Sequence, residues 1–453
     1  MGVKLKTWGP ALFCLTVVLV FTMAYHYRAP FHDHWALIPY YGRMQDGTLP
    51  FQDVFALSGN HWHASGIFVM LGLSKLTAMG HWAEALASGL IAGLGFFALV
   101  RIIKRTIDGM TAPSLMAWAI GVTAFLYFSL DQAGNWLWGW QISVFLNVTG
   151  ALWTIDRLSC GPPTLRNIMI AILAAAMSIY AFGAGWVLIP IGWGLLLIHG
   201  ALKTRRGCLA FGLWSVFATL MLWHFSLALS ASAQAYTASA LPTLADPATV
   251  LGLLHYTINF IASPIVRFAR DISIPITILA LGVAVYSMST LRRGVAKLDW
   301  RDLSPLLALA AYAIGAGLLT ALGRWELYGV KQAFVSRYIT FGTLFWIAVF
   351  LLAMLAIAKT PGRPHRVMYG LLGLLFVLKI GNIPSVVQKS VRISGEIAAA
   401  AELVAADYPD VTPDQYQVLH SPLQKIEPYL DTLAAHEVSL FANRPEDAPL
   451  EDE

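Results

Sequence analysis

The sequence predicts an all-α protein that crosses a membrane many times. Hydrophobic residues make up 57% of its 453 residues and charged residues only 12%, and the mean hydropathy is +0.64. A soluble protein of this length needs more polar surface than that composition supplies. Several apolar runs are also long enough to span the hydrocarbon core of a bilayer as helices. We therefore expect a polytopic membrane protein in contact with membrane lipids, with no nucleic acid as a partner.

About eleven apolar runs are expected to form transmembrane helices. They fall at 8–27, 83–100, 112–130, 136–155, 166–182, 186–202, 207–230, 272–291, 304–322, 338–358 and 367–383. The first run follows Lys4 and Lys6 and precedes no small-residue cleavage site, so we expect a retained anchor. Two further stretches, 63–79 and 251–268, are interrupted by Gly, His, Pro or Arg. With them, up to thirteen segments would lie in the membrane.

Basic residues favour the eleven-crossing arrangement. If both doubtful stretches crossed, the clusters at 101–105 and 203–206 would face outward, which the positive-inside rule disfavours. If neither crosses, these clusters and most other basic residues face the cytoplasm. The predicted topology therefore has a cytoplasmic N-terminus and an external C-terminus.

The last seventy residues differ in character from the rest. Segment 384–453 is rich in acidic residues, has apolar positions at near-helical intervals, and then carries several prolines. We expect a transmembrane domain over 1–383 and a small external helical tail over 384–453, packed on the external loops. The terminal 445–453 should be disordered.

The first external loop, 28–63, carries the densest group of polar and aromatic residues and is expected to contain juxtamembrane helices. Asp33 follows the first membrane helix closely and is flanked by His32, His34 and Trp35, which are expected to bind substrate. A carboxylate there can accept a proton from a hydroxyl group or hold a divalent cation such as Mg²⁺ or Mn²⁺. The alternative is a helix N-cap, because Asp is a favoured capping residue.

The end of this loop carries two histidines. His61 and His63 are two residues apart, which places both imidazoles on one face of an extended segment, and Asp53 is near in sequence. The loop therefore predicts catalytic roles for Asp33, Asp53, His61 and His63, with Asp33, His61 and His63 as the metal ligands. The alternative is an interfacial aromatic belt around Trp62.

A second polar cluster opens the fourth apolar run. Indoles at that depth are most often interfacial anchors, but amides and acids there usually face a polar cavity. Indole next to amide is also how proteins hold sugar rings. Substrate-binding candidates in this cluster are Asp131, Gln132, Asn135, Trp136, Trp138 and Gln141.

A third external loop is basic. Arg324, Glu326, Arg337 and Tyr338 lie in or beside it, and Arg337 stands at the start of a predicted membrane helix. The planar guanidinium suits a phosphate at headgroup depth, because it bonds oxygens in pairs. Headgroup snorkelling is the alternative for Arg337, and a local ion pair is the alternative for Arg324 with Glu326.

These motifs resemble the GT-C glycosyltransferases. A group of uncharacterised bacterial membrane proteins of that type shares Asp-x-Trp (Asp33–Trp35), Asn-Trp-Leu-Trp-Gly-x-Gln (Asn135–Gln141) and Ser-Arg-Tyr (Ser336–Tyr338). The resemblance covers the layout of residues 8 to about 383. GT-C enzymes move a sugar from a polyprenyl-phosphate carrier to an acceptor on the non-cytoplasmic face, with a key acid in the first external loop. That loop often has adjacent acids in the family, whereas here Asp33 is flanked by histidines.

The resemblance implies a glycosyltransferase of the bacterial inner membrane with a polyprenyl-phosphate-sugar donor and a glycan, lipid or protein acceptor. Asp33 would act as general base or bind a cation, and Arg337 would stabilise the departing lipid phosphate. His61 and His63 would assist. Two alternatives from other classes are a transporter or flippase for a lipid-linked sugar and a non-catalytic partner in envelope polysaccharide assembly.

Overall fold

The computed structural model describes residues 2–59, 61–107, 113–232, 245–293, 298–360, 366–420 and 426–442. Within these ranges the regular elements are all helices, apart from an isolated bridge between Ser58 and His61. The predicted all-α fold is confirmed. Most of the external loop after 230 and the end predicted to be disordered, 445–453, lie outside the described residues.

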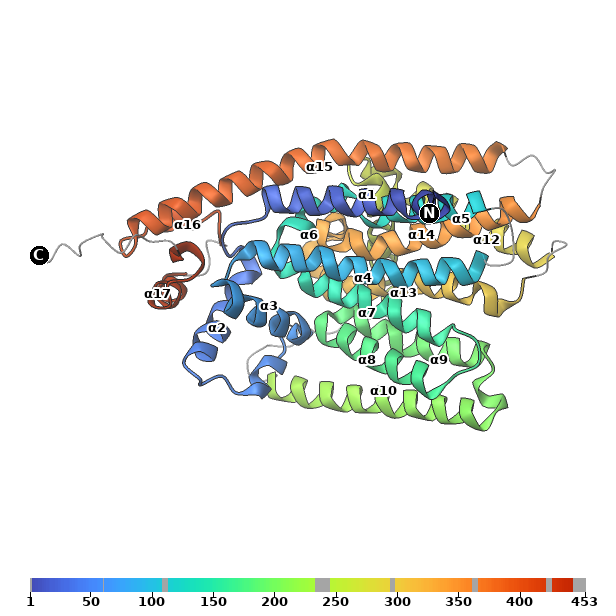
Figure 1. Ribbon diagram of the computed structural model, residues 1–453, viewed down its shortest axis with the longest axis horizontal. Coiled ribbons are helices and arrows are strands. Elements are labelled where there is room, and N and C mark those ends of the chain that lie inside the picture. The colour runs from blue at the N-terminus through green and yellow to red at the C-terminus, as the bar shows by residue number, and fades with distance from the viewer. Residues whose placement is uncertain are drawn as a thin grey trace, which may run out of the picture.

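Long helices run side by side along the long axis of the molecule (Figure 1). They are α1 (Gly2–Tyr25), α4 (His81–Ile107), α5 (Pro113–Tyr127), α7 (Ile142–Leu158), α8 (Leu165–Ala181), α9 (Leu188–Ile198), α10 (Arg205–Ser232), α12 (Ser273–Arg293), α13 (Trp300–Tyr328), α14 (Ser336–Lys359) and α15 (Arg366–Asp407). By length and composition, nine of the described helices could cross a membrane. That number includes α11 (Pro247–Val266) and omits α7, α8 and α9. The eleven-crossing topology stays a prediction.

The two doubtful stretches adopt different helices. Segment 63–79 contains α3 (Ala64–Thr77), whose 14 residues are too few to cross a bilayer. The other stretch is α11. Midway along α11 Tyr256 donates a hydrogen bond to Gln332, and just past the end of α11 Arg267 donates one to the Asp131 carbonyl. Both partners lie in the polar segments that precede or follow membrane helices at one end of the bundle. Helix α11 is also long and apolar enough to cross a membrane, so whether 251–268 crosses stays a prediction.

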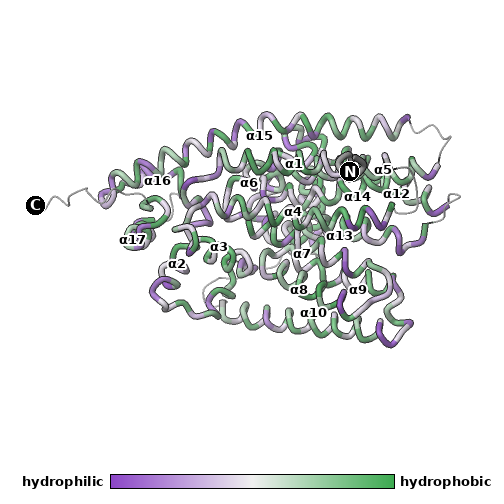
Figure 2. Tube along the Cα trace, viewed as in Figure 1, coloured by the Kyte–Doolittle hydropathy of each residue, from purple (hydrophilic) through white to green (hydrophobic). Residues whose placement is uncertain are grey.

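The outer helices present apolar side chains to their surroundings. On α10 the exposed residues include Leu209, Val216, Leu220 and Trp223, and Figure 2 shows the hydrophobic colour running along the bundle. By contrast α14, in the interior, is buried over most of its length. An apolar exterior around helices whose backbone groups are all bonded internally is what the hydrocarbon core requires.

Short helices gather at one end of the bundle, called the loop end below and drawn at the left in Figure 1. Segment 28–63, predicted to be the first external loop and called the first loop below, forms η1 (His32–Leu37), α2 (Ile38–Gln45) and η2 (Phe51–Phe55). Later segments there form η3 (Leu130–Gln132), α6 (Ala133–Leu137), η4 (Gly139–Gln141), η5 (Gly183–Val187) and η8 (Val330–Phe334). The segment between α11 and α12 forms η7 (Arg270–Ile272), and η6 (Ala201–Lys203) lies between α9 and α10.

The C-terminal tail packs on the first loop. Helix α15 continues through Pro384, so the expected domain boundary at 383/384 falls inside it. Beyond it α16 (Pro413–Tyr416), α17 (Glu427–Ala435) and η9 (Ser439–Phe441) pack on the loop (Figure 1). The Leu419 carbonyl accepts hydrogen bonds from the His32 backbone N–H and from the Trp35 indole. Tail and loop therefore form one body at the loop end.

Candidate functional site

Two residues far apart in the sequence form an open ion pair at the loop end. Asp33 lies in η1, and Arg337 lies in the first turn of α14. The Arg337 guanidinium is 3.6 Å from Asp33 Oδ2, and the two side chains are 34% and 55% exposed. A pair this open can exchange its partner for a ligand, since exposed ion pairs contribute little stability.

His61 and His63 lie beside this pair. Their ring centroids are 4.7 Å apart. Burial, with smaller contributions from the positive charges of Arg324 and Arg337 and an opposing effect of Asp33, lowers the pKa of His61 to about 4. Burial, His61 and Arg337 hold the pKa of His63 well below its ordinary value. Asp33, His61, His63, Arg324 and Arg337 are called the polar cluster below.

Both imidazoles of the polar cluster are therefore neutral near pH 7, which gives a pH prediction. Unfolded His61 takes up a proton near pH 6.5, whereas folded His61 does so only near pH 4. The folded state then binds fewer protons, so stability should fall as the pH drops from 6.5 towards 4. In His61→Gln this loss should be smaller. Thermal unfolding of both proteins in detergent across that range tests it, and equal pH dependence would contradict the prediction.

Most of the residues expected to form a sugar pocket instead make buried contacts between helices. The Asn135 amide donates to the Ser336 carbonyl and to Thr340, and Gln132 accepts from the Thr340 hydroxyl. Trp136 stacks on Phe145 in the core. These buried contacts fix α6 against the start of α14, which is the helix that carries Arg337.

Asp131 has a buried partner of its own. Its carboxylate pairs with Lys379 of α15, and both side chains are almost fully enclosed, at 1% and 0% exposure. Since a buried charge needs a partner, this pair connects η3 to α15 and leaves neither group free for substrate.

Trp138 is the indole of the cluster that lies closest to the first loop. Its ring lies edge-on to Phe31 at 5.4 Å and near His32 at 6.4 Å. It is only 7% exposed, and its indole N–H has no hydrogen-bond partner among the described residues. Burial lowers the pKa of the adjacent His32. This indole remains a candidate sugar contact.

The remaining candidates lie elsewhere. Asp53 pairs with Arg43 in the first loop, so its carboxylate already has a partner outside the polar cluster. Glu326 is exposed, Gln141 is buried, and Tyr338 is buried against Phe260. Trp35 is fully buried, and its indole N–H donates a hydrogen bond to the Leu419 carbonyl of the tail.

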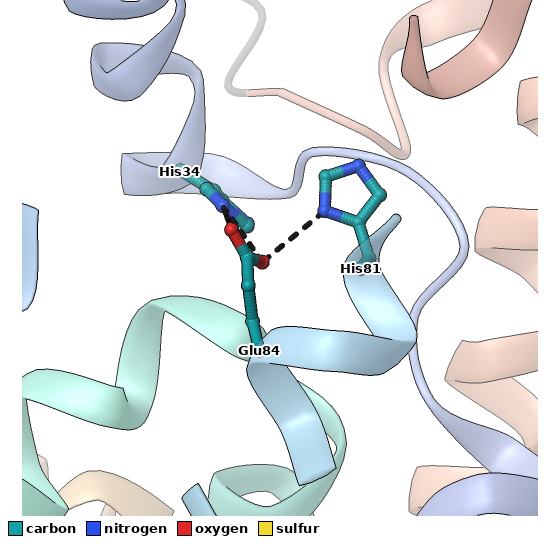
Figure 3. Close-up of side chains that lie close together, drawn as sticks. All are labelled: His34, His81 and Glu84. Carbon is teal, nitrogen blue, oxygen red and sulfur yellow. Dashed lines mark hydrogen bonds and ion pairs between the residues drawn. The ribbon is translucent and has the colours of Figure 1, made fainter. Parts of the chain in front are cut away.

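His34, also expected to bind substrate, faces inward instead. Its imidazole contacts the Glu84 carboxylate, and that carboxylate also contacts the His81 imidazole (Figure 3). All three side chains are buried. Among the described residues, these three are the His, Cys or acidic side chains that lie close enough together to hold one metal ion. The expected ligand set of Asp33, His61 and His63 is not brought together in that way.

Sequence reasoning missed Lys379, His81 and Glu84. Lys379 is a lone charge in the predicted run 367–383, and Glu84 is a lone acid in the run 83–100. An ionisable residue inside an apolar run usually has a partner, so both could have been singled out. Their partners, Asp131 and His34, were named only as substrate contacts because their spatial neighbours are far away in sequence.

No family model and no curated protein sequence matches this chain. Among solved structures, the chain is similar to the crystal structure of ArnT from Cupriavidus metallidurans bound to undecaprenyl phosphate. The identity is 14%, the TM-score is 0.45, and the match covers 96% of this chain and 76% of that chain.

Proposed function

We propose that the protein transfers a sugar from a polyprenyl-phosphate-linked donor to an acceptor at the loop end of the membrane bundle, on the external, periplasmic face. The observation that carries the proposal is the open Asp33–Arg337 pair beside two neutral imidazoles. A base and a phosphate-binding group are the two functions that such a transfer needs on opposite sides of the reacting carbon. The sequence resemblance to GT-C enzymes supplies the substrate class.

Arg337 is proposed to bind the phosphate that leaves with the lipid. Its planar guanidinium can bond two phosphate oxygens at once, and Arg324 adds a second positive charge nearby. In the structure described here Asp33 holds Arg337. A donor phosphate would replace the carboxylate and release Asp33 for the acceptor.

Asp33 is proposed to accept the proton of the acceptor hydroxyl. As that proton moves to the carboxylate, the acceptor oxygen forms a bond to the sugar, and the bond between sugar and phosphate breaks. The electron pair of that bond stays with the lipid phosphate, next to Arg337. His61 and His63, being neutral, can hydrogen-bond sugar hydroxyls without adding positive charge.

A divalent cation at Asp33 is not required by this scheme. Mg²⁺ and Mn²⁺ prefer oxygen ligands, and of the polar cluster only Asp33 supplies a carboxylate. The guanidinium 3.6 Å away also competes for that carboxylate.

The proposal is tested by donor turnover. Purified protein in detergent is given a synthetic polyprenyl-phosphate sugar and a membrane extract as acceptor, and the released polyprenyl phosphate is quantified. Arg337→Ala should lower kcat/KM by about 10²–10³-fold. Arg337→Lys should lose less, because it keeps the charge but not the planar fork.

The matched control is Arg392→Ala, which changes an exposed arginine of α15 whose ion pair among the described residues is with Glu396. It should turn over the donor at the wild-type rate. Wild-type turnover in Arg337→Ala would remove the role given to Arg337, and no turnover in the wild type with any lipid-linked sugar would count against the whole proposal.

One observation favours the transporter alternative. The Asp131–Lys379 pair is an ionisable pair buried among membrane helices, and such pairs mark transport pathways in many proteins. Reconstitution in vesicles separates the two functions. Movement of a lipid-linked sugar between leaflets without transfer to an acceptor would favour the transporter.

A further inference from the structure

A buried group of three potential metal ligands lies outside the polar cluster. His81 and Glu84 are in the first turn of α4, and His34 follows Asp33 in η1 (Figure 3). The side chains of His34, His81 and Glu84 are 1%, 4% and 2% exposed. Their ligand atoms all lie within 4.8 Å of one another.

We propose that His34, His81 and Glu84 bind a transition-metal ion, with Zn²⁺ as the best match, and that this ion fixes the first loop to the start of α4. The site is separate from the polar cluster and from the transfer reaction proposed above.

The distances carry the proposal. His34 Nε2 is 3.3 and 3.2 Å from the two Glu84 oxygens, and His81 Nδ1 is 3.3 Å from Glu84 Oε2. Charge-assisted hydrogen bonds are shorter, at about 2.7–2.9 Å. In a tetrahedral zinc site with bonds of about 2.0–2.1 Å, neighbouring ligand atoms are about 3.3 Å apart. The two His–Glu spacings lie at the long end of the hydrogen-bond range and match those between ligands of one ion.

The ligand types select the metal. Two imidazole nitrogens and one carboxylate oxygen suit Zn²⁺ and related first-row ions, whereas Mg²⁺ and Ca²⁺ prefer oxygen ligands alone. A buried carboxylate also needs positive charge close to it, which a divalent ion supplies. Three protein ligands leave a fourth position for a water molecule.

Neighbouring groups support this geometry. The outer nitrogen of His81, Nε2, is 2.9 Å from the Ser439 hydroxyl, so an Nε2–H can donate to Ser439 while Nδ1 faces the ion. Metal-bound histidines commonly have such a second partner, which fixes the tautomer. Gly139 of η4 lies against Glu84, and a Cβ there would overlap the carboxylate.

The position of the site determines which parts of the protein a bound ion would hold together. His34 is next to Asp33 in η1, and Ser439 belongs to the tail. An ion held by His34, His81 and Glu84 would therefore fix η1, α4 and the tail relative to one another, and with them the carboxylate that faces Arg337.

The test is metal content. The full chain, purified in detergent without metal affinity steps, is analysed by inductively coupled plasma mass spectrometry, and about one zinc ion per chain is expected. Glu84→Gln and His81→Ala should each lower the metal content at least about 10-fold. His255→Ala, an exposed histidine on α11, is the matched control and should keep the wild-type content.

A second measurement covers variants that fail to fold. Wild-type protein stripped with a chelator should show a lower melting temperature that added Zn²⁺ restores, whereas Mg²⁺ should not restore it. Wild-type protein that holds no first-row metal after incubation with Zn²⁺, or folded variants with unchanged metal content, would overturn the site. These results leave the Arg337 turnover test untouched, so the two proposals fail separately.

Discussion

Asp33→Asn is expected to lower the rate of sugar transfer by about 10²–10⁴-fold, the range typical of a lost general base. Asparagine keeps the size of the side chain but cannot take a proton from the acceptor hydroxyl. Because Asp33 is 55% exposed, and its ion pair with Arg337 is open, the variant should fold and insert as the wild type does. Donor turnover and donor binding are measured together.

Donor binding should be retained or strengthened in this variant, since Arg337 is released from the carboxylate. Asp46→Asn is the matched control: it is an exposed acid of the same loop, with only a distant contact to His436 at 3.8 Å. It should transfer sugar at the wild-type rate. An Asp33→Asn protein that folds and turns over donor normally would contradict the central role of Asp33.

Lys379→Met is expected to destabilise the protein by about 3–5 kcal/mol, because it leaves the Asp131 carboxylate buried without its partner. One oxygen of Asp131 already lacks a hydrogen bond among the described residues, and Arg267 donates to the Asp131 backbone carbonyl, not to its carboxylate, in the contacts the structure shows. Replacing both residues with apolar ones, as in Asp131→Leu with Lys379→Met, should recover most of the loss. Thermal unfolding in detergent provides the measurement.

The control for Lys379 lies on the same helix. Lys389→Met changes an exposed lysine of α15 and should leave the melting temperature nearly unchanged. If Lys379→Met were as stable as the wild type, the pair would not stabilise the fold. If the double variant kept its stability but lost sugar transfer or transport, the pair would serve function instead.

The sequence predicted the helical membrane fold because apolar runs and basic loops are local properties. A run such as 338–358 is apolar enough by itself to require a bilayer, and the structure has α14 there. Local chemistry also singled out Asp33 and Arg337, since few charged residues lie directly beside the ends of the predicted membrane helices. The ion pair between them can be inferred from the sequence only if both residues lie on the same side of the membrane.

The sequence alone could not show which polar residues are free for substrate. Asp131, Gln132 and Asn135 looked like a pocket lining, yet each is buried against a partner far along the chain. Burial and pairing depend on which helices pack together, and no local pattern encodes that.

The sequence by itself determined whether each segment lies in lipid or in water, because hydropathy and charge are properties of single residues. What only the tertiary structure decided is which residues became partners. Asp33 and His34 are adjacent in the chain, yet one faces Arg337 in the open and the other is enclosed with His81 and Glu84. The physical reason is that successive side chains of a short helix point in different directions, so neighbours in sequence enter different environments.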